Sequence, residues 1–215
     1  MLVLTTTNQK YVPIVSNLLK SFKKYQPNIK IIVSCVNVRE QSISEMQKLN
    51  EKSEFIVENY EFNDNNHERN YCAHNRVYHM PRLMKNNKQD IFWLDADVYL
   101  RGKIDAFITW LSDYDFAIRA KEMNPYRCNC GMVWAKYSEK NIQILEEWKE
   151  EAEKLDILNF WYADQNSLNS VMNKHINVLK DIKYSTFPLE FDGVSTNEKS
   201  AIVHLKGPKK MELFK

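Results

Sequence analysis

Residues 92–105 read FWLDADVYLRGKID, and this stretch decides the fold. The apolar run at 91–94 is typical of a buried strand, and it ends in Asp95 and Asp97, which lie on the same side of an extended chain. Open α/β sheets bind their ligands at the carboxyl ends of strands, so two carboxylates here indicate a binding site. A hard divalent cation, Mg²⁺ or Mn²⁺, suits this pair of oxygen ligands, and a bound diphosphate would complete its coordination shell. The alternative is a solvated turn that carries two surface acids.

The segments on both sides of this stretch alternate between strand and helix patterns. Short apolar or β-branched runs predict strands at 2–5, 29–36, 55–57, 91–94, 116–118, 131–135 and 201–203. Steps of three and four residues predict helices at 11–25, 44–51, 71–85 and 138–155, with Pro81 kinking or splitting the third and Ser138 capping the last. Residues 61–70 have no apolar period and predict a loop. The alternation predicts an α/β fold with a central, mostly parallel sheet flanked by helices, in a single domain.

Glycine is scarce, with only 4 residues in 215. No two of them are spaced for a G-x-G-x-x-G dinucleotide loop or a Walker phosphate loop, so a bound phosphate must be held by side chains or by a metal. The 30 Lys and Arg against 28 Asp and Glu leave a net charge of +2, which gives no general attraction for nucleic acid or for an anionic membrane. The sequence lacks a run of about 20 apolar residues, so we expect no membrane span and a cytoplasmic location.

The four cysteines are not arranged as a disulfide framework. Cys128-x-Cys130 could be combined with Cys72 and His74 in a zinc site, although a matching second pair is missing. Ordinary free thiols are the other interpretation.

Residues 92–105 resemble the D-x-D segment of glycosyltransferases with the GT-A fold. Further segments follow in the order expected for glycosyltransferase family 8, the glycogenin and lipopolysaccharide galactosyltransferase group. They are TTTNQKYVPIVSNLLKSF at 5–22, the region of Arg76, CNCGMVWAK at 128–136, ADQNSLNSV at 163–171 and VHLKGPKK at 203–210. The resemblance implies one Rossmann-like GT-A domain over 1–215. Its nucleotide-binding half would be 1–100, and its acceptor and sugar half, with a metal-binding C-terminal strand, would be 101–215.

The resemblance also implies an activity. The chain would move a hexose or pentose from a nucleotide diphosphate donor, expected to be a UDP-sugar, to an acceptor hydroxyl with retention of anomeric configuration. A glycan, a protein hydroxyl and a modified DNA base remain open as acceptors. A nucleotide-sugar-binding module without turnover and a sugar nucleotidyltransferase are the alternatives, although the latter normally needs a glycine-rich loop. The short chain is similar to minimal GT-A cores of bacteria and viruses, which implies the cytoplasm of a bacterium or of a virus-infected cell.

The resemblance assigns a role to each candidate site residue. Asp95, Asp97 and His204 would hold Mn²⁺ or Mg²⁺. Asp164 would orient sugar hydroxyls, and Gln165 would be the polar group nearest the anomeric carbon. Because neither is a strong nucleophile in these roles, a front-face route with the leaving phosphate as base is favoured over a covalent intermediate.

The donor would contact a larger set of residues. Tyr11 would stack on uracil, or else serve as the first core residue of its helix. Arg76 would reach toward the donor sugar, with Arg82 as the competing arginine. The predicted donor-binding residues are Thr5, Asn8, Tyr11, Arg76, Ala96, Asn129, Gly131, Gly207 and Lys210.

Overall fold

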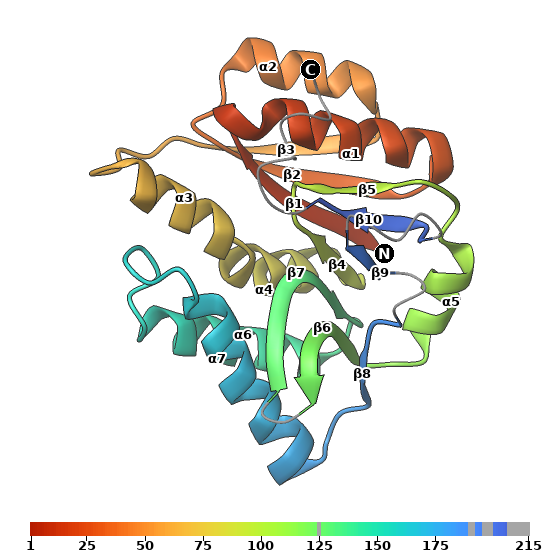
Figure 1. Ribbon diagram of the computed structural model, residues 1–215, viewed down its shortest axis with the longest axis vertical. Coiled ribbons are helices and arrows are strands. Elements are labelled where there is room, and N and C mark those ends of the chain that lie inside the picture. Colours follow the sequence, from red (N-terminus) through yellow and green to blue (C-terminus); the bar gives the residue numbers. More distant parts are fainter. Residues whose placement is uncertain (124–125, 189–191, 195–199, 206–215) are drawn as a thin grey trace. The chain divides into compact units, whose positions relative to one another are not determined.

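The computed structural model describes residues 1–123, 126–188, 192–194 and 200–205 (Figure 1). The chain forms two compact units, each made of segments that are separate in the sequence. Unit 1 comprises Met1–Tyr60, Leu94–Trp110 and Pro188–Lys215, and unit 2 comprises Glu61–Trp93 and Leu111–Phe187. The predicted donor-binding residues Gly207 and Lys210 lie outside the described residues.

Unit 1 begins with alternating strands and helices. The strands β1 (Leu2–Asn8), β2 (Lys30–Val36) and β3 (Ser53–Glu58) lie in the order β3-β2-β1, and both pairings are parallel. A 3₁₀ turn (Gln9–Tyr11) leads into α1 (Val12–Tyr25), and α2 (Glu40–Leu49) connects β2 to β3. Nearly every side chain of β1 and β2 is buried, as expected for parallel strands covered by crossover helices.

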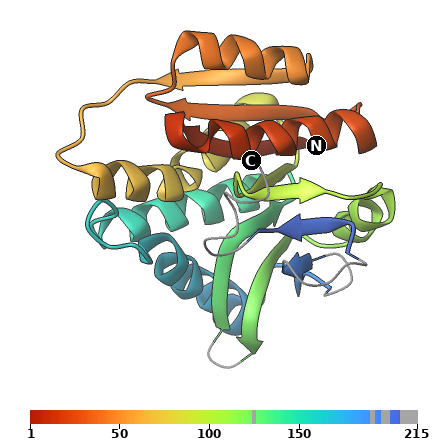
Figure 2. The same ribbon diagram turned by 45° about the horizontal axis from the view of Figure 1, so that its top comes forward.

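A second, three-stranded sheet in unit 1 joins segments far apart in the sequence. It contains β5 (Val98–Leu100), β9 (Asp192–Val194) and β10 (Ile202–His204) in the order β5-β10-β9. β5 and β10 run antiparallel, as Figure 2 shows, and their register places His204 opposite Val98. α1 packs beside β5, and the Ser21 hydroxyl accepts a hydrogen bond from the Leu100 N–H at 3.0 Å.

Unit 2 combines an antiparallel hairpin with helices. Its strands β4 (Ile91–Leu94), β6 (Phe116–Met123), β7 (Tyr126–Ala135) and β8 (Tyr184–Thr186) lie in the order β4-β7-β6-β8. β6 pairs antiparallel with β7 and parallel with β8. The helices are α3 (Asn65–His74), α4 (Arg76–Asn87), α6 (Glu139–Glu153) and α7 (Ala163–Asn173), followed by a π-helix at Lys174–Leu179. The α/β character is confirmed, and over the two units together the parallel pairings β1–β2, β2–β3, β9–β10 and β6–β8 outnumber the antiparallel ones. α5 (Asp105–Ser112) follows β5 in the chain. In the described part of the chain, every helix is too short or too polar to cross a membrane.

The region 61–85 differs from the expectation. The predicted loop at 61–70 contains most of α3, because the Asp64 carboxylate accepts hydrogen bonds from the Asn66 and His67 N–H groups at 2.7 and 2.9 Å. The break between helices falls at Asn75 and not at Pro81, which lies inside α4. α4 buries an apolar face that includes Val77, Met80 and Met84, and this packing offsets the hydrogen bond that a proline removes.

Several other predicted features are found close to their expected places. Ser138 caps α6 as predicted, since its hydroxyl accepts a hydrogen bond from the Asn141 N–H at 3.0 Å. α2 begins four residues before the predicted Ser44. The three-residue strands β5, β8 and β9 escaped prediction, because such short strands carry too few residues to show a period.

Candidate active site

Two carboxylates and an imidazole meet at one point of unit 1. Asp95, Asp97 and His204 each offer a ligand atom, and these atoms lie within 4.8 Å of one another. The His204 Nε2 atom lies 2.9 Å from the Asp97 Oδ1 atom and 3.8 Å from the Asp95 Oδ2 atom. Asp97 and His204 are buried, whereas the Asp95 side chain is 30% exposed. The cluster therefore has a closed side and an open side.

The backbone brings these three side chains together through a turn and a strand pair. The Asp95 carbonyl accepts a hydrogen bond from the Val98 N–H at 3.0 Å, so residues 95–98 form a turn and not the extended chain expected from the sequence. Antiparallel pairing of β5 with β10 then carries His204 to the same place. The Leu205 N–H donates to the Asp97 carbonyl at 2.9 Å and closes this arrangement.

The donor set fits a divalent cation. Two carboxylates that converge at such short range repel each other, and a cation between them removes that cost. Carboxylate oxygens with one imidazole nitrogen suit Mn²⁺ and also allow Mg²⁺, which prefers oxygen ligands. A cation held from the buried side by Asp97 and His204 would keep coordination positions on the side of Asp95.

Two of the predicted nucleotide-binding residues of unit 1, Asn8 and Tyr11, lie where β1 ends. Asn8 caps the 3₁₀ turn, with its side-chain oxygen accepting from the Tyr11 N–H at 3.2 Å. Tyr11 is only half-buried, so it is not a core residue of the helix, and the stacking role stays a prediction. Thr5 is fully buried on β1, and its hydroxyl has no hydrogen-bond partner among the described residues. Ala96 lies half-buried in the turn between the two aspartates.

A second cluster, in unit 2, is built around Asp164 at the start of α7. Asp164 and Arg76 are 3% and 5% exposed, and the Arg76 Nε atom lies 3.4 Å from the Asp164 Oδ2 atom. The same guanidinium donates hydrogen bonds to the Ala73 and Cys130 carbonyls and lies over the ring of Trp93 at 4.8 Å. The competing Arg82 is exposed and contacts His79 at 2.5 Å. Of the two arginines, Arg76 is the one that the fold places beside Asp164.

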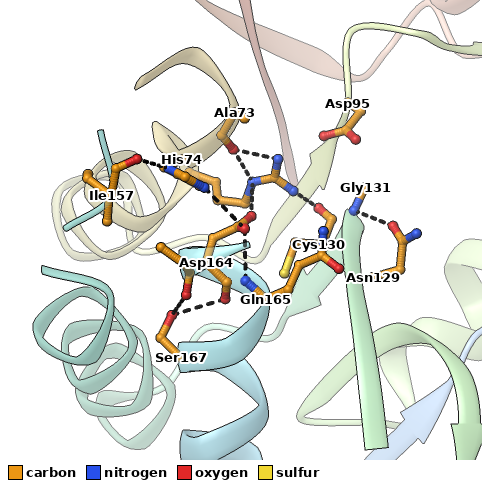
Figure 3. A network of polar contacts seen from close by, with 12 residues as sticks. Ala73, His74, Asp95, Asn129, Cys130, Gly131, Ile157, Asp164, Gln165 and Ser167 are labelled. Carbon is orange, nitrogen blue, oxygen red and sulfur yellow. Dashed lines mark hydrogen bonds and ion pairs between the residues drawn. The ribbon is translucent and has the colours of Figure 1, made fainter. Parts of the chain in front are cut away.

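His74 completes this second cluster. Its ring is fully buried, with Nδ1 2.7 Å from the Ile157 carbonyl and Nε2 3.1 Å from the Trp161 carbonyl. The Nε2 atom also lies 3.4 Å from the Asp164 Oδ1 atom. Figure 3 shows the ring between Ile157 and the Asp164 carboxylate. Asp164 is thus approached by positively charged or donating groups at both oxygens.

The remaining predicted residues of unit 2 border this cluster. The Gln165 N–H donates to the Asp164 Oδ1 atom at 2.8 Å, and the Gln165 side chain is half-buried. On β7, the Asn129 side-chain oxygen accepts from the Gly131 N–H at 2.9 Å. Asn169, the last residue of the D-Q-x-x-L-N element, accepts from the Cys128 N–H at 2.9 Å and ties α7 to β7.

His74 was considered only as a zinc ligand in the sequence, and its contact with Asp164 was missed. A histidine two residues before Arg76 is a weak signal, because the partners of its ring come from residues 157–164, far along the chain. Asn169 likewise lies in the D-Q-x-x-L-N element, and its sequence context gives it no role. Both residues act through contacts that no local pattern reveals.

The cysteines behave as thiols and not as metal ligands. All four lie in the described part of the chain, and none is in a disulfide. Within that part, the group of metal-binding side chains that converges contains no cysteine, so the zinc alternative has no support. Burial, with a smaller contribution from the charge of Asp164, raises the pKa of the Cys128 thiol to about 12. Burial, and then Glu58, raises the pKa of Cys35 to about 12 as well.

We expect thiol reagents to distinguish these cysteines. A pKa of about 12 leaves roughly one thiolate in 10⁴ at pH 8, so buried Cys35 and Cys128 should react only after unfolding. Half-exposed Cys72 should react in the folded chain. A time course with a chromogenic disulfide reagent checks this, and Cys72→Ser should remove the fast phase. A fast phase that persists in Cys72→Ser would contradict the assignment.

Comparisons with known proteins agree on one class. Residues 34–212 match the family model described as nucleotide-diphospho-sugar transferase. The galactosyltransferase LgtC, solved in complex with donor and acceptor sugar analogs, superposes with a TM-score of 0.61 at 13% identity over 97% of this chain and 88% of that chain. The glycosyltransferase GlyE of Streptococcus pneumoniae TIGR4 superposes with a TM-score of 0.67 at 13% identity over 97% of this chain. The bifunctional glycosyltransferase WbbM superposes with a TM-score of 0.66 at 12% identity over 99% of this chain.

The coverage differs among these proteins. This chain spans 55% of the GlyE chain and 50% of the WbbM chain. None of the curated proteins matches the sequence. At 12–13% identity the superpositions establish the fold, which is the GT-A fold expected from the sequence.

Proposed function

Because this chain belongs to the nucleotide-diphospho-sugar transferase family and is a glycosyltransferase, we propose that it transfers a sugar from a UDP-linked donor to an acceptor hydroxyl, with retention of configuration and with a divalent cation bound at Asp95, Asp97 and His204. The observation that carries the proposal is the convergence of these three side chains within 4.8 Å. Residues from separate parts of the chain meet there at the end of an apolar strand, which the alternative of a solvated acidic turn does not explain.

Asp95, Asp97 and His204 would hold Mn²⁺ or Mg²⁺, which when bound would supply Lewis acid stabilisation of the charge on the leaving diphosphate. The protein's contribution is to hold the ligands in place before the donor arrives. Asp97 and His204 are buried and tied to each other across β5 and β10, so they are fixed, while the more exposed Asp95 faces the open side. This preorganisation favours the transition state, in which the bond to phosphate has largely broken, over the ground state.

We assign the sugar-binding role to the cluster of unit 2. Both oxygens of Asp164 are engaged, Oδ1 by the Gln165 N–H and Oδ2 by Arg76 at 3.4 Å. A carboxylate held in this way is a poor nucleophile but a well-placed acceptor for sugar hydroxyls. This supports the front-face route, with a phosphate oxygen of the leaving group as base. One solved structure of LgtC carries a glutamine-to-glutamate change in its active site, and Gln165 is our candidate for the equivalent role.

The uridine preference would come from the end of β1. Tyr11 offers a half-exposed ring for stacking, and Asn8 has its amide nitrogen for the edge of a base, since its oxygen caps the turn. The acceptor is a hydroxyl compound of a class that these residues do not specify. We favour a glycan or a protein hydroxyl over a modified DNA base, because a net charge of +2 gives little general attraction for DNA.

A donor screen tests the proposal. Purified protein is incubated with Mn²⁺ and a panel of nucleotide sugars, and slow hydrolysis is read as released nucleotide. We expect release from UDP-sugars and none after addition of EDTA. Full activity in EDTA would exclude the metal role, and release from a different nucleotide would correct the donor. Tight binding of UDP-sugars by calorimetry without release, with every acceptor tried, would instead identify a binding module without turnover.

A further inference from the structure

Among the described residues, the polar contacts of the buried His74 ring are all with hydrogen-bond acceptors. Nδ1 lies 2.7 Å from the Ile157 carbonyl oxygen, and Nε2 lies 3.1 Å from the Trp161 carbonyl oxygen and 3.4 Å from the Asp164 Oδ1 atom. A carbonyl oxygen cannot donate a proton. Each ring nitrogen therefore has to be the donor in its own contact.

Neither neutral form of the ring satisfies these contacts. With the proton on Nδ1 alone, the Nε2 lone pair would point at the Trp161 carbonyl oxygen. With the proton on Nε2 alone, the Nδ1 lone pair would face the Ile157 carbonyl oxygen at 2.7 Å. In either case two buried lone pairs would oppose each other and a hydrogen bond would be lost. The doubly protonated ring satisfies all the acceptors.

The surroundings supply the counter-charge that a buried cation needs. Asp164 is 3% exposed, and it faces both the His74 ring and the guanidinium of Arg76, the first residue of α4. A further cation is also near: the Arg69 guanidinium of α3 lies 4.6 Å from the centre of the ring of Trp161, a residue of the loop that His74 contacts. A buried imidazolium without Asp164 would carry a large desolvation cost, and so would a buried Asp164 carboxylate without a cation beside it.

We propose that His74 is held as an imidazolium and is a positioning residue, which fixes the Asp164 carboxylate and joins α3 to the loop that leads into α7. The loop is held along one face of α3. Besides the two contacts of His74, the Asn70 side-chain amide donates to the Leu158 carbonyl at 2.6 Å, and the His67 ring contacts the Asn159 side chain at 2.9 Å. Asp164 lies just after this loop, so the contacts of α3 with the loop help to fix the position of the Asp164 carboxylate.

The effect of His74 on sugar transfer, described next, rests on the proposed function. A carboxylate held between two fixed cations keeps one orientation, which would present its remaining lone pairs to the sugar. Loss of the His74 charge would remove one of the two cations beside Asp164 and leave the Arg76 guanidinium. We expect the effect mainly on kcat, because orientation at the reacting centre matters more in the transition state than in donor binding.

Nitrogen NMR tests the protonation state without any turnover. The full chain is labelled with ¹⁵N-histidine, and long-range proton–nitrogen spectra are recorded at pH 7, with His74→Gln used for assignment. We expect two protonated-type nitrogens for His74. His79 is the internal reference, because its Nδ1 accepts from Arg82 at 2.5 Å and should give a pyridine-type signal. A pyridine-type nitrogen in His74 would overturn the proposal.

Two variants test the link to Asp164. In Asp164→Asn the counter-charge is removed at nearly constant shape, and one His74 nitrogen should become pyridine-type at the same pH. An unchanged spectrum would show that the carbonyl groups alone hold the ring charged, and it would overturn the pairing. In His74→Gln, which keeps a donor but loses the charge, we expect donor kcat to fall roughly 10- to 100-fold with KM changed less than 3-fold. A change confined to KM would overturn the positioning role. If the spectra agree and no nucleotide sugar is turned over by the wild type, the proposed function fails and the imidazolium stands.

Discussion

Replacing Asp97 by asparagine is expected to lower metal-dependent release of nucleotide from the donor by roughly 1,000-fold. Asp97 is the buried carboxylate of the cluster, 2.9 Å from His204. A bound cation contributes several kcal/mol of charge stabilisation in the transition state, and losing about 4 kcal/mol corresponds to roughly three factors of ten in rate. The measurement is nucleotide release at saturating Mn²⁺, together with Mn²⁺ affinity by calorimetry. The His204→Ala variant should weaken Mn²⁺ binding in the same direction.

The matched control is Asp113→Asn, which neutralises an exposed acid of the turn after α5. It removes the same charge from the chain without touching the cluster, so activity and Mn²⁺ affinity should stay within about 2-fold of wild type. Circular dichroism should show that both variants remain folded. Asp97→Asn with wild-type release, or with wild-type Mn²⁺ affinity, would refute the assigned metal site.

Replacing Arg76 by methionine is expected to lower the free energy of unfolding by about 3–5 kcal/mol, because it breaks a buried ion pair and leaves one partner behind. The guanidinium bridges the Ala73 and Cys130 carbonyls to Asp164, and it is itself 5% exposed. Methionine fills the space but donates no hydrogen bond. Urea denaturation followed by tryptophan fluorescence reports the loss, since Trp93 lies directly under the Arg76 guanidinium.

Arg82→Met is the control for this change. Arg82 lies on the same helix but is exposed, and exposed side-chain contacts contribute about 0–1 kcal/mol. The two substitutions are chemically identical, so the difference between them isolates the effect of burial. Equal stability of the two variants would mean that Arg76 does not support the fold, and that its place beside Asp164 serves substrate alone.

The parts of the fold that the sequence predicts are those with a local signal. β1, β2, β4 and α6 follow from apolar runs or from a helical period, and Ser138 follows from the rules of helix capping. Most of α3 gave no such signal, because residues 65–70 are all polar. It forms because Asp64 caps it, and because His67, Asn70 and His74 bind the loop at 157–161, a partner that no window of the sequence contains.

The candidate site shows the same division. Asp95 and Asp97 were selected because two carboxylates directly after a buried apolar strand are unusual, and Asp164 was selected because its segment resembles a family motif. His204 was selected only because a motif resemblance pointed to it. Its distance to Asp97 depends on the antiparallel pairing of β5 with β10, two three-residue strands without any period of their own. The contact of His74 with Asp164 had no predictor at all.

The sequence by itself determined the α/β class, the end of β4 as the place of an acidic pair, and the exclusion of glycine-rich phosphate loops, because each depends on residues that are neighbours in the chain. The tertiary structure decided that His204 joins the aspartates, that Arg76 and not Arg82 meets Asp164, and that His74 faces three acceptors. These outcomes depend on which distant segments share a hydrogen bond. Pairing of that kind is set by the packing of the whole unit, and short stretches of sequence carry almost no record of it.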